Sequence, residues 1–132
     1  MKFRLTVLFL VLVQHAYADD SWRIETNQNG KPFVRVIDQP RLDGLLRSKW
    51  EAMKEALRTG DTAKASTYII KRKQPLYKNV FDNLIVSFDE AAQYLGDIVW
   101  SKQNGPFVEY DAPNGSVIFQ LEEDNEWRIQ FF

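Results

Sequence analysis

Residues 107–121 decide the fold, and they read FVEYDAPNGSVIFQL. Hydrophobic and polar residues alternate on both sides of a central turn, which is the pattern of two half-buried antiparallel strands. Asn-Gly is the preferred pair for a two-residue type I′ hairpin turn. The sequence therefore predicts strands at 107–112 and 116–121, joined through Asn114 and Gly115.

This turn sets a register that a third strand, residues 127–132, extends. In it Tyr110 faces Phe119, and Phe119 in turn faces Ile129. A slip by one residue would exchange the apolar and polar faces, so the register is well specified. The apolar face is expected to contain Val108, Tyr110, Ala112, Val117, Phe119, Leu121, Trp127, Ile129 and Phe131. A sheet with one apolar face needs a cover.

Amphipathic helices that precede the sheet can supply that cover. A stripe with spacings of three and four begins at residue 41, and its members are Leu42, Leu45, Leu46, Trp50, Met53 and Leu57. Gly60 is expected to end this helix, and Asp61 to cap a short second helix that runs through Ile69.

Two more helices are expected before the sheet. Pro75 can open the first of them, whose apolar face consists of Leu76, Tyr77, Val80, Phe81 and Leu84. Ser87 and Glu90 form a capping box for the second, which ends at Gly96 before a short strand at 97–101. Helices followed by an antiparallel meander predict an α+β fold, with the helices packed on a curved antiparallel sheet.

The first eighteen residues have the parts of a secretory signal peptide. Lys2 and Arg4 precede an apolar stretch, and Ala16 and Ala18 stand at the −3 and −1 positions of a cleavage site. The stretch is about half the ~20 residues that a membrane span needs, so no stable membrane anchor is expected after cleavage. We therefore expect an exported protein, periplasmic or secreted, with an N-terminal extension at 19–40 that can form an edge hairpin.

Composition excludes several kinds of chemistry. The chain has 132 residues, no cysteine and one histidine, and that histidine, His15, leaves with the signal peptide. Neither a Ser-His-Asp triad nor a zinc site of the usual ligands can then form, and no cofactor or metal is expected. The formal net charge of −1, without a basic stripe, also indicates no nucleic-acid partner.

Four features in order resemble a known family. They are the helix end ALRTGD at 56–61, the helix with Tyr77 and Phe81, the Tyr110-Asp111 strand and the closing WRI at 127–129. The chain resembles the cystatin-like α+β roll superfamily that includes nuclear transport factor 2 and ketosteroid isomerase, and its small exported bacterial members in particular. The resemblance covers about residues 41–132. It implies one roll domain there, with a sheet curved around a long helix and a cone that is open or plugged.

Seven aromatic residues either fill the core or line a ligand pocket in that cone: Trp50, Tyr77, Phe81, Trp100, Tyr110, Phe119 and Trp127. A proton-transfer site would need a carboxylate base beside a tyrosine or a protonated acid. Asp111 falls on the opposite face from Tyr110, so no catalytic residue is predicted. We expect a non-enzymatic protein with a binding or structural role in the bacterial envelope. The alternatives are a carrier of a small apolar ligand in the cone and, with less support, a small isomerase or lyase.

Two surface features complete the predictions. Residues 122–126, EEDNE, suggest a calcium loop, but they lack alternating aspartates and a glycine, so a solvated acidic turn is favoured. The outer sheet face is polar apart from Ile118 and Phe132. A monomer is therefore expected, with a weak dimer through that face as the alternative. The sequence identifies no partner.

Overall fold

The computed structural model describes residues 21–132, and the predicted signal peptide, residues 1–18 with His15, lies outside this part. The described residues divide into two compact units, with the boundary between Leu42 and Asp43. Helices and two antiparallel sheets make up the described residues, so the α+β class is confirmed.

In the first unit the hairpin forms, from β1 (Trp22–Thr26) and β2 (Pro32–Val36). Its turn is closed by the side chain of Asn27, which accepts hydrogen bonds from the backbone N–H groups of Asn29 and Lys31. Pro32 is the first residue of its strand, a position where the missing N–H is tolerated.

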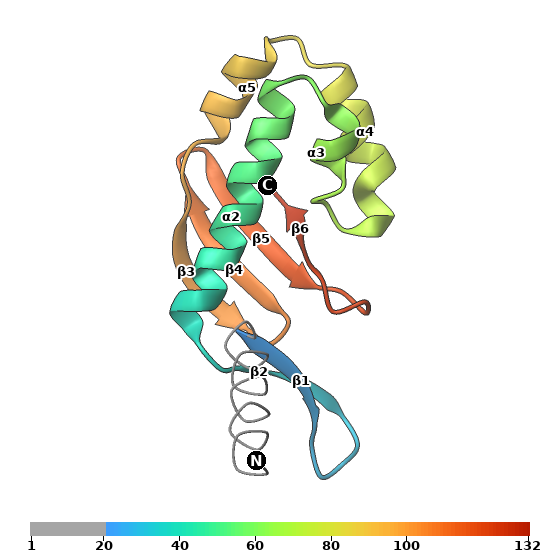
Figure 1. The fold of residues 1–132 in the computed structure, drawn as a ribbon, viewed down its shortest axis with the longest axis vertical. Helices are drawn as coiled ribbons and strands as arrows, with labels where there is room; N and C mark the ends of the chain where they lie inside the picture. The colour runs from blue at the N-terminus through green and yellow to red at the C-terminus, as the bar shows by residue number, and fades with distance from the viewer. Residues whose placement is uncertain (1–20) are drawn as a thin grey trace, which may run out of the picture. The chain divides into compact units, whose positions relative to one another are not determined.

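The long helix α2 (Gln39–Arg58) crosses one face of the four-stranded sheet (Figure 1). The predicted stripe is buried except for one member, and its buried residues are Leu42, Leu46, Trp50, Met53 and Leu57. Leu45 is exposed, contrary to the prediction. It directly precedes Leu46, so on a helix of 3.6 residues per turn it points about 100° away from the buried side.

The second helix is shorter than predicted. Gly60 ends α2 with φ +80°, and the Asp61 side chain accepts from the Lys64 N–H to begin α3 (Thr62–Ser66). The prediction that the helix continues to Ile69 is wrong, because this backbone bonds to the sheet instead. The N–H of Ile129 donates to Tyr68 O at 2.7 Å, and the N–H of Ile70 donates to Ile129 O at 2.9 Å.

A short 3₁₀ turn, η1 (Lys71–Lys73), leads into α4 (Gln74–Asp82), and α5 (Phe88–Leu95) follows after a loop. Pro75 lies in the first turn of α4, as predicted. The predicted apolar face of α4 is only partly covered: Phe81 is buried and Tyr77 half-buried, whereas Leu76 and Val80 are exposed. The Ser87 side chain caps α5.

The four-stranded sheet has the order β3-β4-β5-β6 and is open, neither closed nor curled (Figure 1). Its strands are β3 (Val99–Asn104), β4 (Phe107–Ala112), β5 (Gly115–Leu121) and β6 (Trp127–Phe131). The first strand begins two residues later than predicted.

The register between β4 and β5 differs from the predicted one by two residues. The turn residues are Pro113 and Asn114, so Ala112 faces Gly115 and Tyr110 faces Val117. A type I′ turn needs a positive φ at both central residues. Asn114 does not have one, and the ring of Pro113 fixes a φ suited to the first corner of an ordinary turn. A shift of two keeps every side chain on its predicted face.

Between β5 and β6 the predicted pairs Phe119–Ile129 and Leu121–Trp127 form. The prediction pairs Phe131 with Val117, on the inner face. A bulge instead makes Phe131 the partner of Ile118, on the outer face. The extra residue exchanges the faces of the last two positions. Phe131 points outward and is 51% exposed, and Phe132 turns inward, which is the reverse of the prediction.

Candidate functional site

The predicted aromatic residues do not line one cavity. Trp50, Phe81, Tyr110, Phe119 and Trp127 are buried, and Tyr77 and Trp100 are half-buried. Their rings form two groups. In the first, Tyr110 lies edge-on to both Trp100 and Phe119, with ring centres 5.6 and 5.7 Å apart.

The second group surrounds Phe132, which the sequence placed on the outer face. Its ring centre lies 5.6 Å from Trp50, 5.0 Å from Tyr77 and 6.3 Å from Phe81. The bulge in β6 brings Phe132 there, and no feature of the sequence indicates that bulge.

Tyr110 has an acidic partner that the sequence reasoning missed. Its hydroxyl donates to Asp43 Oδ1 at 2.7 Å, and Arg47 Nε donates to the same oxygen at 3.0 Å. Burial raises the pKa of Tyr110 well above its usual range, and the Asp43 carboxylate raises it further. The phenol therefore keeps its proton and serves as a hydrogen-bond donor. The sequence feature that could have drawn attention to Asp43 is its i,i+4 spacing from Arg47. Asp111 is exposed, on the other face of the sheet, as predicted.

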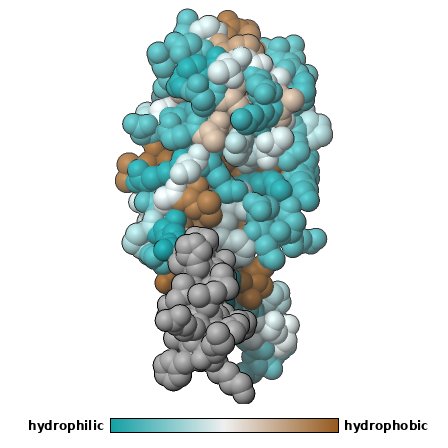
Figure 2. Space-filling view, in the orientation of Figure 1, coloured by the Kyte–Doolittle hydropathy of each residue, from teal (hydrophilic) through white to brown (hydrophobic). Residues whose placement is uncertain are grey.

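Exposed apolar side chains gather at the helical end of residues 43–132. Among the described residues, eleven large hydrophobic side chains are exposed, and five of them belong to α4, α5 and the loop between them: Leu76, Val80, Ile85, Val86 and Tyr94. Ile85 is fully exposed. In Figure 2 the top of the view, over the loop that joins α4 to α5, carries the hydrophobic colour.

Three of these side chains, Val80, Val86 and Tyr94, border a hollow of about 320 Å³, which we call the helical groove. It is lined by Leu57, Val80, Phe81, Leu84, Val86, Glu90, Ala91, Tyr94, Leu95 and Phe132. A second hollow of about 430 Å³ adjoins it, because both are lined by Tyr94, Leu95 and Phe132. Of the predicted pocket residues, Phe81 lines the groove and Trp50 lines its neighbour.

The wall formed by α5 is fixed at its C-terminal end. Trp50 Nε1 and Lys54 Nζ both donate to Gly96 O at 2.8 Å, and Asn114 Nδ2 donates to Tyr94 O at 2.7 Å. Gly96 has φ +66° and packs against Pro113 so closely that a Cβ would lie 2.7 Å from its Cγ. The groove therefore has one wall that the sheet's β4–β5 turn holds in place.

Within residues 21–132, Glu90 is the one charged residue that lines the groove. The sequence predicts a reciprocal capping box, in which the Glu90 carboxylate bonds back to the N–H of Ser87. Only half of it forms in the described part of the chain: the Glu90 N–H donates to Ser87 Oγ at 3.1 Å. The Glu90 carboxylate does not bond to Ser87 and lies at the groove.

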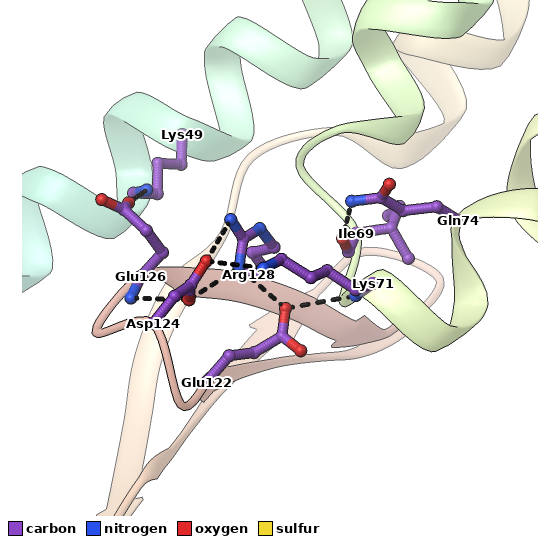
Figure 3. A network of polar contacts seen from close by, with 8 residues as sticks. All are labelled: Lys49, Ile69, Lys71, Gln74, Glu122, Asp124, Glu126 and Arg128. Atoms are coloured by element: carbon purple, nitrogen blue, oxygen red, sulfur yellow. Dashed lines mark hydrogen bonds and ion pairs between the residues drawn. The ribbon is translucent and has the colours of Figure 1, made fainter.

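The acidic turn at 122–126 is held by basic residues rather than by solvent alone (Figure 3). Arg128 donates to both oxygens of Asp124, at 3.0 and 2.9 Å, and to Glu122 at 3.0 Å. This pairing holds the pKa of Asp124 well below its usual range. Lys71 also contacts Asp124, and Lys49 contacts Glu126. The carboxylates of the turn thus connect it to α2 through Lys49 and to η1 through Lys71.

Residues 21–132 contain neither a metal-binding cluster nor a membrane-spanning helix. No group of three or more His, Cys, Asp or Glu in this part is arranged to hold a metal ion. Among the same residues, no helix has the length and apolar character that a membrane crossing requires.

Comparisons of the chain with models of known families, with curated proteins and with solved structures found no match. The resemblance to the α+β roll superfamily therefore stays a prediction from the sequence.

Proposed function

We propose that the chain is an exported, non-catalytic binding domain of the bacterial envelope, and that the helical groove is its binding site. The observation that carries the proposal is that Val80, Val86 and Tyr94 are exposed and line a hollow whose lining is apolar apart from Glu90. Large exposed apolar patches on a soluble domain mark interaction sites.

The energetics favour an apolar occupant. Removing apolar surface from water contributes roughly 25 cal/mol per Å², so a covered groove is more stable than an open one. The side chains at its rim are far from covered: Val80 is 46% exposed and Val86 is 45% exposed. An apolar side chain or ligand that enters the groove would cover them together with Phe132.

A catalytic role has less support from the same geometry. Proton transfer would need a carboxylate and a phenol that are free to reach a substrate. The Tyr110 hydroxyl and the Asp43 carboxylate instead bond to each other, and Arg47 holds the same carboxylate.

Export is supported by the signal-like composition of residues 1–18.

The second candidate is a carrier of a small apolar ligand. The hollow beside the helical groove, of about 430 Å³, favours it, because ligand pockets commonly measure 300–1,000 Å³. The resemblance would put such a ligand in a cone between helix and sheet. Trp50 and Phe119 are buried and occupy that layer, so a site outside the cone is the better-supported version.

Binding of the uncharged fluorophore Nile red, whose emission rises in apolar surroundings, tests the proposal. We expect the purified chain to bind it, and Val80→Ser and Val86→Ser to weaken binding several-fold. Val99→Ser is the matched control, because Val99 is 60% exposed on β3 and does not line the groove.

Equal weakening by all three substitutions would show general surface adsorption and would contradict the proposal. Circular dichroism spectra show whether each variant still folds. We expect that all three do, because the substituted positions are exposed.

A further inference from the structure

We propose that the helical groove accepts a segment of a partner protein in which large apolar side chains stand beside a lysine or arginine. This inference rests on the proposed function and adds the charge of the partner to it. The feature that carries it is a carboxylate at the edge of an apolar groove, with its neighbouring charges already paired.

Glu90 is that carboxylate. In a complete capping box it would bond to the N–H of Ser87, but among residues 21–132 its side chain has no hydrogen bond or ion pair. It lines the groove together with Val86, Ala91 and other apolar residues. A cation on the occupant would pair with it, whereas an anion would meet a like charge.

The charges around Glu90 do not compensate it. The nearest basic residue on α4, Lys78, bonds to Asp82 at 2.6 Å, and Thr62 bonds to the same carboxylate at 2.5 Å. On α5, Asp89 pairs with Arg58 at 3.4 Å, and Arg58 is also bound to Glu55. Lys78 and Arg58 are thus both engaged by other carboxylates, and neither compensates the charge of Glu90.

The same charges favour a partner protein over the other occupants. Anionic lipid surfaces attract basic segments, and an acidic rim opposes them. A second copy of this chain would bring its own groove, in which Glu90 is again, among the described residues, the carboxylate without a partner. Two such grooves placed together would set like charges against each other.

A groove between two helices also suits a helical segment, which anchors itself through side chains at i, i+3 or i+4 and i+7. The two adjoining hollows, which share Tyr94, Leu95 and Phe132, offer places for more than one such anchor.

Three labelled peptides of equal length, with the same leucine positions and with lysine, glutamine or glutamate elsewhere, serve as probes. Fluorescence anisotropy measures their affinity for the chain. We expect the order lysine, glutamine, glutamate from tightest to weakest. Glu90→Gln should weaken the lysine peptide about 2–5-fold, as for an exposed ion pair, and leave the glutamine peptide unchanged.

Glu123→Gln is the matched control, because Glu123 is an exposed carboxylate outside the groove that lines a separate hollow by the β5–β6 turn. It should change the affinity of the lysine peptide by less than about 1.5-fold. Equal weakening by Glu90→Gln and Glu123→Gln would reveal general charge attraction and overturn the inference.

Two further outcomes separate the inference from the proposed function. If all three peptides bind equally well and Val86→Ser weakens them all, the inference fails and the proposed function stands. If no peptide binds and Val86→Ser does not change Nile red binding, both fail. A dimer in light scattering that Val86→Ser abolishes, or tighter binding to phosphatidylglycerol vesicles than to the lysine peptide, would also overturn the inference.

Discussion

The inner layer of the four-stranded sheet and the helical groove are built from the same kinds of side chain, and they differ in what covers them. Phe119 and Val108 are completely buried beneath α2, whereas Val80, Val86 and Tyr94, which line the groove, are exposed. The two regions are thus alike in composition and opposite in burial. Apolar surface that is covered contributes to folding, and apolar surface left open is available for binding.

The largest expected difference comes from truncating one large side chain in each region. Phe119→Ala should lower the free energy of unfolding by about 3–5 kcal/mol, from lost burial and the cavity that remains. Val86→Ala, its counterpart at the groove, should change it by less than about 0.5 kcal/mol. Urea unfolding measures both. Similar losses in the two variants would show that the groove is covered in solution.

A smaller effect is expected where the two regions join, at the end of α5. Gly96 has φ +66° and ψ −162°, a conformation available almost only to glycine. Gly96→Ala should therefore destabilise the fold by about 1–3 kcal/mol and loosen the groove wall. Gly44→Ala in α2, where an added Cβ meets no atom within 4 Å, should instead stabilise it by up to about 1 kcal/mol. Thermal unfolding of both variants distinguishes the outcomes.

The polar contact inside the covered layer is expected to matter less than its packing. Tyr110→Phe keeps the ring between Trp100 and Phe119 and removes the hydrogen bond to Asp43. We expect a loss of about 1–2 kcal/mol in urea unfolding. A loss as large as that of Phe119→Ala would mean that the hydroxyl, rather than the ring, holds α2 on the sheet.

The smallest effect concerns the acidic turn at 122–126, between β5 and β6, and it depends on pH. Hydrogen bonding to Arg128 lowers the pKa of Asp124 in the folded chain below its ordinary value of 3.8. Its contribution to stability is therefore complete above that value and is lost as pH falls through the lower, folded-state pKa.

We expect Asp124→Asn to destabilise the chain at pH 7 and the difference from the unchanged protein to shrink below about pH 4. Glu123→Gln, in the same turn, is the control and should show little difference at either pH. Denaturant unfolding across the acid range measures both. A difference that stays constant down to pH 2 would contradict the role given to this carboxylate.

The sequence predicted the faces of the sheet better than its pairing. Alternation gave the inner residues Tyr110 and Phe119 correctly, because side-chain period depends only on the strand itself. It could not give the turn, where the fixed ring of Pro113 overrode the Asn-Gly signal. It also could not give the bulge that exchanges Phe131 and Phe132, since a bulge depends on the neighbouring strand.

The candidate site was less predictable than the fold. A helical period shows which side chains share a face, but not whether another element covers that face. For this reason Leu76 and Val80 were correctly grouped on the apolar face of their helix, but the sequence did not show that they are exposed. Asp43 escaped notice for a related cause: its partner, Tyr110, lies on a strand far along the chain.

The bonds between residues 68–70 and β6 have a consequence for aggregation. An edge strand with unpaired backbone groups is a template for fibril growth. Here the backbone N–H and C=O of Ile129 are already hydrogen-bonded to Tyr68 and Ile70. At the other edge, β3 carries an irregularity between Trp100 and Lys102. Both edges are therefore poor templates for an incoming strand. These edges therefore do not add to the aggregation risk of an open apolar groove.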